Sequence, residues 1–366
     1  MTIESHPTET VLPAHRGGFP GHLRRRWQVY VGLLISAFFL YRVLSQMGTQ
    51  LGILWTELQG AHYLWIVPGV AVYFLGVWAR TWRWHYMLRP VQRVPLHRLF
   101  PIVCIGYMGN NIYPARAGEL LRAYILRREQ GVSISASLAT IVAERIFDGI
   151  VMLIFVFVGL PFVPAVPPEW RRIVVLFTVL FFGALVAFFL LAVSPERTQK
   201  AYLWLIERLI PRRFRRPVQG VADRFLEGLR CLRSPSDLAM IFATSVAVWL
   251  AETVKYWFVM HGFAFSVPFF VLMLMNGVVN LMTTLPASPG YIGTFDWPGI
   301  EVLVSYLGEK SRAVATAYTF VLHAALWFPI TALGAFYMLR RGLSWTTVQR
   351  EMAARRQGGR AEKEGE

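Results

Sequence analysis

The sequence predicts an all-α polytopic membrane protein with about six full transmembrane helices and two re-entrant helical hairpins of opposite orientation, making eight hydrophobic segments. Of its 366 residues, 55% are hydrophobic and only 16% are charged. Several apolar runs reach the roughly 20 residues that a helix needs to cross a bilayer. These runs are continuous rather than alternating, which favours helices over a β-barrel.

The basic charge of the chain agrees with this prediction. The net charge is +16, and the Lys and Arg residues gather between the apolar runs. We interpret them as a positive-inside bias toward anionic headgroups in a cytoplasmic membrane, with no nucleic acid as partner. Cys104 lies in an apolar run and Cys231 in a basic loop. A disulfide framework or a cysteine-based metal site is therefore not expected, and we predict no metal and no cofactor.

The first two spans are predicted at residues 27–44 and 61–82. Residues 1–26 lack hydrophobic periodicity and end in three arginines, which predicts a disordered cytoplasmic N-terminus. The segment between the spans is nearly free of Lys and Arg, as expected of an outer loop. Arg80 and Arg83, which alternate with tryptophans, are interpreted as an interfacial belt on the inner side.

The next apolar segment is too short to be a full span. Residues 99–114 are apolar but short, and the chain resumes as a helix at 117–128. Because both ends are basic, a hairpin that enters from the cytoplasm and returns there is the economical topology. Broken helices at membrane depth occur where they line a cavity or are covered by protein. The alternative is two short complete spans with an exposed tip.

The rest of the chain continues this pattern within a single membrane domain, residues 27–341. Both termini are expected in the cytoplasm, so the second broken segment must start and end outside. Residues 194–237 are predicted to be a basic cytoplasmic loop with amphipathic helices that rest on anionic lipid. Further full spans are expected at 133–160, 172–193, 238–260 and 312–339, a second hairpin at 267–285 and 295–307, and a cytoplasmic tail at 342–366.

Polar side chains at membrane depth mark the candidate site, because burying them in lipid is costly. Arg116, Glu119 and Arg122 recur at a spacing of three and share one stripe of the returning helix. The first-turn N–H groups of that helix can bind an anion, and arginine donates bidentately to phosphate. We predict that Arg116, Arg122 and Arg145 bind a lipid phosphate. Asn110 and Asn111 are expected beside it.

Carboxylates accompany these arginines. We expect Glu119, Glu144 and Asp148 to balance the arginine charges or to bind a proton. The alternative is that the same groups form a structural network that joins the first hairpin to the next span. Glu252 and Lys255 lie one turn apart, and they are expected to neutralise each other.

The second broken segment supplies the other half of the predicted site. Gly290, Gly293 and Thr294 suggest a nest of backbone and hydroxyl donors for an anion. Asp296 is a candidate partner for Arg116 or Arg145. The lone mid-span residue His323 is a candidate proton carrier, with a hydrogen-bonded packing role as the alternative.

Two motifs carry a family resemblance. The first, N-x-x-P-x-R-x-G-E-x-x-R at Asn111–Arg122, is followed by E-R-x-x-D at Glu144–Asp148. It resembles the membrane domain of the lysylphosphatidylglycerol synthase/flippase-like family. The second, L-P-x-S-P-G-x-x-G-T at Leu285–Thr294, is similar to that family's later signature. The resemblance covers residues 27–341 and implies a lipid flippase-like domain.

The resemblance suggests a function. We expect a lipid transporter that moves an anionic or phosphate-bearing lipid, aminoacylated or polyprenyl-linked, across the cytoplasmic membrane, and we assign no catalytic residue. Only 25 residues follow Arg341, so we expect no soluble aminoacyl-transfer domain. The alternative is an accessory subunit or a transferase acting on a polyprenyl phosphate or phospholipid. Expected partners are membrane lipids, an envelope-lipid synthase or glycosyltransferase, and a second copy in a homodimer.

Overall fold

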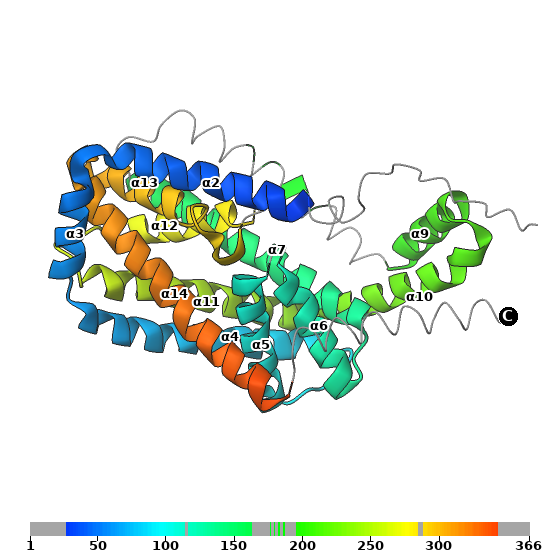
Figure 1. The fold of residues 1–366 in the computed structure, drawn as a ribbon. Coiled ribbons are helices and arrows are strands. Elements are labelled where there is room, and N and C mark those ends of the chain that lie inside the picture. Colours follow the sequence, from blue (N-terminus) through cyan, green and yellow to red (C-terminus); the bar gives the residue numbers. More distant parts are fainter. Residues whose placement is uncertain are drawn as a thin grey trace, which may run out of the picture.

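The computed structural model describes residues 27–113, 116–162, 195–284 and 288–342, together with five residues between 176 and 186. Within these ranges all regular secondary structure is helical (Figure 1). The predicted N-terminus at 1–26, nearly all of the predicted tail and most of the predicted span at 172–193 lie outside the described residues.

Two long helices, α4 (Ile66–Leu88) and α11 (Pro235–Met260), form an antiparallel pair through the body of the molecule (Figure 1). A Cβ atom on Gly69 would lie 3.4 Å from the Val259 side chain, so the missing side chain allows close packing there. At the same end, the amide of His62 donates a hydrogen bond of 2.8 Å to the carbonyl of Gly262. The start of α4 is therefore fixed beside the end of α11.

The two predicted broken segments are both helical hairpins. The first comprises α5 (Leu96–Ile112) and α6 (Ala117–Gln130), and the second comprises α12 (Phe269–Met282) and α13 (Asp296–Leu307). Their arms have 12 to 17 residues, fewer than the roughly 20 of a full span. One hairpin follows the end of α4 and the other the end of α11. Because that pair is antiparallel, the hairpins enter from opposite ends.

Close glycine contacts hold the hairpins to their neighbours. Helix α7 (Ile134–Gly159) begins at Ser133, whose hydroxyl accepts a 3.2 Å hydrogen bond from the amide of Ala136. A Cβ atom on Gly277 of α12 would lie 2.9 Å from a carbonyl of α7. Helix α14 (Arg312–Arg340) contacts α5 in the same way at Gly334.

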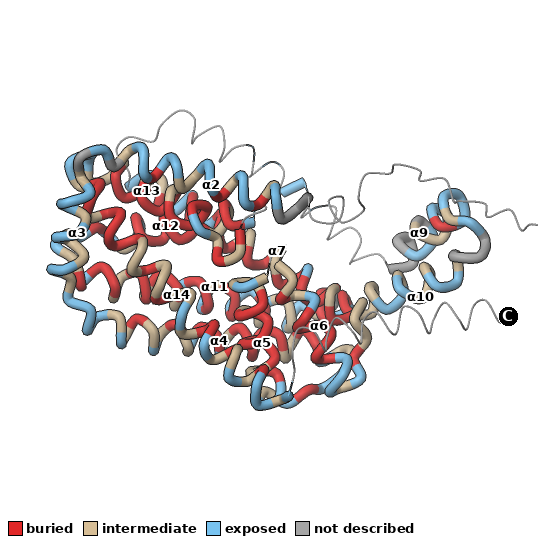
Figure 2. The backbone as a smooth tube through the Cα atoms, viewed as in Figure 1, coloured by how far each residue is buried: buried red, intermediate tan, exposed pale blue. Residues whose placement is uncertain are grey.

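Helices α2 (Trp27–Met47) and α3 (Leu51–Gly60) lie on the outside of the molecule and are mainly exposed (Figure 2). The two helices are bent by 95° relative to each other. The expectation of a loop before residue 60 is thus wrong in part, because α3 is helical there. Its apolar side chains, such as Ile53 and Trp55, are exposed.

Three described helices are long and apolar enough to cross a membrane: Tyr63–Leu88, Pro235–Met260 and Glu309–Arg340. The bent pair Tyr30–Gln46 and Leu51–Gly60 is a candidate for a fourth span. This supports a multi-pass membrane protein. The predicted count of six full spans includes a segment outside the described residues and stays a prediction.

The predicted basic loop contains two helices, α9 (Pro195–Leu209) and α10 (Arg212–Gly228), which extend away from one end of the body (Figure 1). The hydroxyl of Tyr202 donates to Asp223 and joins them. A Cβ atom on Gly228 would lie 2.4 Å from the carbonyl of Ala136, so α10 is fixed against α7. Short 3-10 turns complete the described fold: Gly48–Gln50, Tyr63–Trp65, Leu160–Phe162, Leu229–Arg233, Pro289–Tyr291 (η5) and Glu309–Ser311.

Candidate functional site

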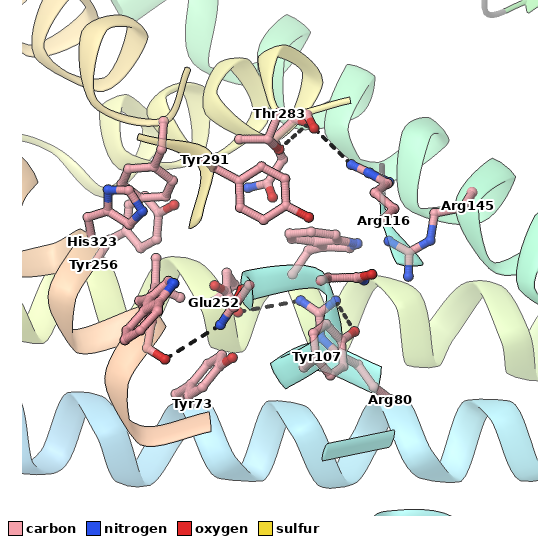
Figure 3. A pocket seen from close by; sticks show the side chains of 17 residues that line it. Tyr73, Arg80, Tyr107, Arg116, Arg145, Glu252, Tyr256, Thr283, Tyr291 and His323 are labelled. Carbon is pink, nitrogen blue, oxygen red and sulfur yellow. Dashed lines mark hydrogen bonds and ion pairs between the residues drawn. The ribbon is translucent and has the colours of Figure 1, made fainter. Parts of the chain in front are cut away.

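A polar cavity of about 140 Å³ lies between the α4–α11 pair and the tips of the two hairpins (Figure 3). In this view α4 forms one side, Thr283 and Tyr291 lie opposite, and His323 and Arg145 lie at the two ends. The predicted site residues that line it are Asn110, Asn111, Arg116, Arg145, Glu252 and His323. Residues more than 200 positions apart in the sequence therefore meet at one cavity.

The charges around this cavity favour an anion. Among the described residues, its lining includes three guanidinium groups, those of Arg80, Arg116 and Arg145, but one carboxylate, that of Glu252. Tyrosine hydroxyls, including Tyr107, and the amide of Asn280 add further polar groups. Among the residues that the structure describes, no group of three or more His, Cys, Asp or Glu side chains is placed to hold a metal ion.

On the α4–α11 side, the charged groups are buried and connected. Arg80 donates to the Tyr107 hydroxyl at 3.0 Å and to Glu252 at 3.4 Å. Lys255 donates to the other oxygen of Glu252 and lies over the Tyr73 ring. Glu252 thus contacts Lys255, the partner that the sequence predicts, and also Arg80, so that one carboxylate meets two cations.

Arg116 connects the two hairpin tips. Its Nη2 atom donates a hydrogen bond of 3.0 Å to the carbonyl of Thr283, at the end of α12. Its backbone is left-handed, with φ of +52°, a conformation that residues other than Gly, Asn and Asp rarely adopt. Glu119 is its nearest carboxylate, at 3.8 Å. The strained backbone thus directs a cation into the contact between the tips.

Behind the cavity, α7 carries a buried ionic network. Arg83 donates to Asp148 at 2.7 Å and to Glu144 at 2.9 Å, and Arg122 donates to Glu144 at 2.8 Å. The side chains of Arg83 and Glu144 are fully buried. The guanidinium of Arg122 also lies 3.7 Å from the centre of the Trp84 ring. The network joins α4, α6 and α7. This is the geometry expected if these charged groups form a structural network that joins the first hairpin to the next span.

Arg145 links this network to the cavity. Its guanidinium lies 3.3 Å from both Glu119 and Asp148 and 3.4 Å from Glu144, yet its side chain remains 30% exposed. Arg122, in contrast, lies with Glu119 beside a much smaller cavity of about 10 Å³. Arg116 and Arg145 are therefore the predicted phosphate ligands that face the larger cavity. The assignment of all three arginines to a lipid phosphate stays a prediction.

At the second tip, the structure corrects the expected partner of Asp296. Its Oδ1 atom lies 2.8 Å from His323 Nδ1, and its Oδ2 atom accepts a hydrogen bond of 2.8 Å from the Gly293 amide. The expectation that Asp296 pairs with Arg116 or Arg145 is wrong, because those arginines are bound to Thr283 and to the carboxylates around α7.

The predicted anion nest of the second tip makes internal hydrogen bonds. The Gly293 amide donates to Asp296, and the Thr294 hydroxyl donates to the carbonyl of Tyr291 at 3.0 Å. Gly290, with φ of +79°, turns its carbonyl toward His323 Nε2 at 2.7 Å. In this conformation these groups stabilise the tip itself, and their binding to a ligand stays a prediction.

An apolar groove adjoins the polar cavity. It has a volume of about 760 Å³ and lies between α2, the two tips and α14, where Phe328 and Ile292 are exposed on it. The groove and the cavity share the lining residues Asn111, His323 and Trp327. A ligand with a polar head and an apolar tail could therefore occupy both at once.

Sequence reasoning missed the role of Arg80 and Arg83. The interfacial-belt interpretation ended the span at residue 82, whereas α4 continues to Leu88 and buries both side chains. The sequence pattern that could have revealed their burial is the helical spacing of the residues on the buried face of α4. Tyr73, Arg80 and Trp84 recur at helical spacing and all face the interior.

Comparison with known proteins identifies two UPF0104 membrane proteins as relatives. The chain is 26% identical over 293 residues to a UPF0104 membrane protein from Methanothermobacter thermautotrophicus, covering 76% of this chain and 85% of the relative. It is 23% identical over 245 residues to a UPF0104 membrane protein from Methanocaldococcus jannaschii, covering 64% of this chain and 95% of the relative.

A third relative is longer. The chain is 23% identical over 317 residues to glycosyltransferase AglD from Haloferax volcanii, a match that covers 79% of this chain but 51% of that protein. Residues 29–334 match the family described as the lysylphosphatidylglycerol synthase TM region. This match covers most of the chain and confirms the resemblance seen in the two motifs. The chain is therefore a multi-pass membrane protein that belongs to the family of the lysylphosphatidylglycerol synthase TM region.

Proposed function

We propose that this protein moves an anionic, phosphate-bearing lipid across the cytoplasmic membrane. The observation that carries the proposal is the joining of an arginine-lined cavity to an apolar groove. A phosphate can accept hydrogen bonds from Arg116 and Arg145, and acyl or polyprenyl chains can lie in the groove against α14. The headgroup then passes through protein while the tails remain in an apolar environment.

The two hairpins supply the moving parts in this proposal. They enter from opposite ends of the α4–α11 pair and meet at their tips, so each tip stands between the cavity and one side of the membrane. Interrupted helices that meet in this way occur at the substrate sites of transporters. Breaking the Arg116 contact with Thr283 would remove a hydrogen bond between the tips and leave the buried network on α7 in place.

A second candidate function is favoured by the similarity to glycosyltransferase AglD. Under this alternative, the domain holds a polyprenyl phosphate for a transfer reaction or serves a transferase as a subunit. The carboxylates of α7 argue for transport, because Glu144 and Asp148 are already bound by Arg83, Arg122 and Arg145. They are not arranged as free metal ligands.

Replacing Arg116 tests the proposal. Arg116→Asn removes the guanidinium but keeps a residue that tolerates a left-handed backbone. We expect lower retention of phosphatidylglycerol by the purified protein, by about tenfold in affinity, since a charge-assisted contact contributes about 1.5–3 kcal/mol. Native mass spectrometry measures the bound lipid. Dithionite bleaching of a fluorescent phosphatidylglycerol in vesicles measures its movement.

The matched control is Arg98→Gln, which removes an arginine from an exposed position where it contacts Gln130. Its lipid content and transport rate should equal those of the wild type. If Arg116→Asn also retains lipid and moves it at the wild-type rate, the cavity is not the headgroup site. A protein that binds lipid but never moves it would favour the transferase or subunit alternative.

A further inference from the structure

Both nitrogens of one partly buried histidine, His323, face oxygen atoms at the second tip. His323 Nδ1 lies 2.8 Å from Asp296 Oδ1, and Nε2 lies 2.7 Å from the carbonyl oxygen of Gly290. The histidine side chain is 14% exposed and stacks on Phe295. It belongs to α14, while its two partners belong to α13 and to the turn η5.

The number of hydrogen atoms in this arrangement is fixed by its chemistry. A carbonyl oxygen only accepts, so Nε2 must donate to Gly290. A neutral imidazole carries one N–H, and Nδ1 would then present a lone pair to Asp296. An ionised carboxylate also only accepts, and its Oδ2 atom already accepts from the Gly293 amide. The contact between Nδ1 and Oδ1 therefore requires one additional proton.

We propose that Asp296, His323 and the Gly290 carbonyl form a proton-binding site that fastens the second hairpin tip to α14. The proton forms an N–H bond at Nδ1 or an O–H bond at Oδ1, and either form satisfies all three groups. When the proton leaves to water, two lone pairs face each other across one of the contacts. Either Gly290 or Asp296 then separates from His323, and the tip is released.

The position of this site connects it to the ligand spaces. His323 lines both the polar cavity and the apolar groove, and among the described residues it is the only ionisable one common to the two linings. Ring-stacked Phe295 and the tip residue Tyr291 also line the cavity. A Cβ atom on Gly290 would lie 3.1 Å from the Trp327 indole nitrogen, so the tip fits closely against α14.

Other ionisable groups set the electrostatic surroundings. Asp296 is the carboxylate in direct contact, and Glu301 on the same helix is bound by Arg312. The cavity places cations, phenols and the carboxylate of Glu252 on the remaining sides, from α4, α5, the first tip, α7, α11 and η5: Tyr73, Arg80, Tyr107, Arg116, Arg145, Glu252, Tyr256 and Tyr291. An anion entering this cavity would reduce the cationic field at His323 and favour proton binding.

Proton and anion would therefore bind cooperatively, and by linkage each raises the affinity for the other. The coupling to lipid movement rests on the proposed function, whereas the proton site itself does not. If one proton accompanies each lipid, a pH gradient biases the distribution of the lipid between leaflets by up to about tenfold per pH unit.

The variant Asp296→Asn removes the need for the additional proton but keeps the hydrogen bonds of the site. The amide oxygen of asparagine can accept from Gly293, and its NH₂ group can donate to Nδ1 of a neutral imidazole. All the contacts are then satisfied without the additional proton. His323→Gln in the Asp296→Asn background keeps the same donor and acceptor pattern without an imidazole, and it identifies the His323 signals by their loss.

The first measurement is ¹⁵N NMR of histidine-labelled protein in phosphatidylcholine bilayers. In the wild type we expect the His323 nitrogen shifts to change in one step across the pH range in which the protein stays folded. At pH values at which the wild type holds the proton, the His323 signals of Asp296→Asn should be those of a neutral imidazole. Wild-type signals that do not change with pH, or a step that Asp296→Asn leaves in place, would overturn the site.

The second measurement tests coupling with the full chain in phosphatidylcholine vesicles that contain fluorescent phosphatidylglycerol. The wild-type leaflet ratio should follow an imposed pH gradient, and the ratio in Asp296→Asn should not. A gradient response that persists in Asp296→Asn refutes the coupling. If the wild type moves no lipid, the proposed function fails, while the NMR result still decides the proton site.

Discussion

Glu144→Gln should lower the free energy of unfolding by about 3–5 kcal/mol, because it removes one member of a buried ionic network. Glu144 is fully buried and accepts hydrogen bonds from Arg83 at 2.9 Å and from Arg122 at 2.8 Å. A neutral amide cannot balance two guanidinium groups, and its NH₂ group faces donors. The loss of folded, monodisperse protein on heating in detergent measures the effect.

Glu129→Gln provides the matched comparison. Glu129 makes an ion pair of 2.6 Å with Arg341, but both side chains are partly exposed to solvent. Exposed ion pairs contribute about 0–1 kcal/mol, so this variant should unfold close to the wild-type temperature. Equal thermal stability of the Glu144 and Glu129 variants would show that the network on α7 does not fix the first hairpin.

Gly118→Ala should destabilise the first hairpin by more than about 3 kcal/mol, at or beyond the upper end of ordinary overpacking effects. The added Cβ atom would lie 1.9 Å from the carbonyl oxygen of Gly106 and 2.5 Å from the amide of Asn110. Both are backbone atoms of α5 and cannot rotate away. The two arms would have to separate, which moves Arg116 and Arg122 from their positions. Thermal unfolding followed by size-exclusion chromatography measures the change.

Gly52→Ala is the control for this prediction. Gly52 lies in α3, and a Cβ atom there would meet nothing within 4 Å. Alanine also favours helix more than glycine, by about 1 kcal/mol, so no loss of stability is expected. A Gly118→Ala protein as stable as Gly52→Ala would mean that the arms of the hairpin are not in close contact.

Much of the fold follows from local patterns in the sequence. The bounds of α7 and α14 differ from the predicted bounds by at most one residue at each end. Ser133 caps the start of α7, and Arg312 is the first residue of α14. Both broken segments were placed correctly from their proline and glycine residues. These signals act over a few positions of the chain, which makes them readable without tertiary structure.

The pairing of the charges could not be predicted in the same way. The sequence shows that Arg80, Arg83 and Asp296 are present but not which partner each one meets. Arg83 contacts residues 61 and 65 positions away, and His323 meets a carbonyl 33 positions away. Such pairs depend on the crossing of α4, α7 and α11 and on the position of η5, which no local pattern specifies.

The two sides of the cavity are held by contacts of different strength. On the α4–α11 side, Arg80, Glu252 and Lys255 form a continuous buried chain of contacts. Across the cavity, Arg116 joins the tips through one hydrogen bond to Thr283, and such a bond contributes a net of about 1 kcal/mol. That is close to thermal energy at room temperature. The α4–α11 wall is thus held by several buried charged contacts, whereas the Arg116 contact between the tips should break and re-form by thermal fluctuation while His323 still holds the second tip to α14.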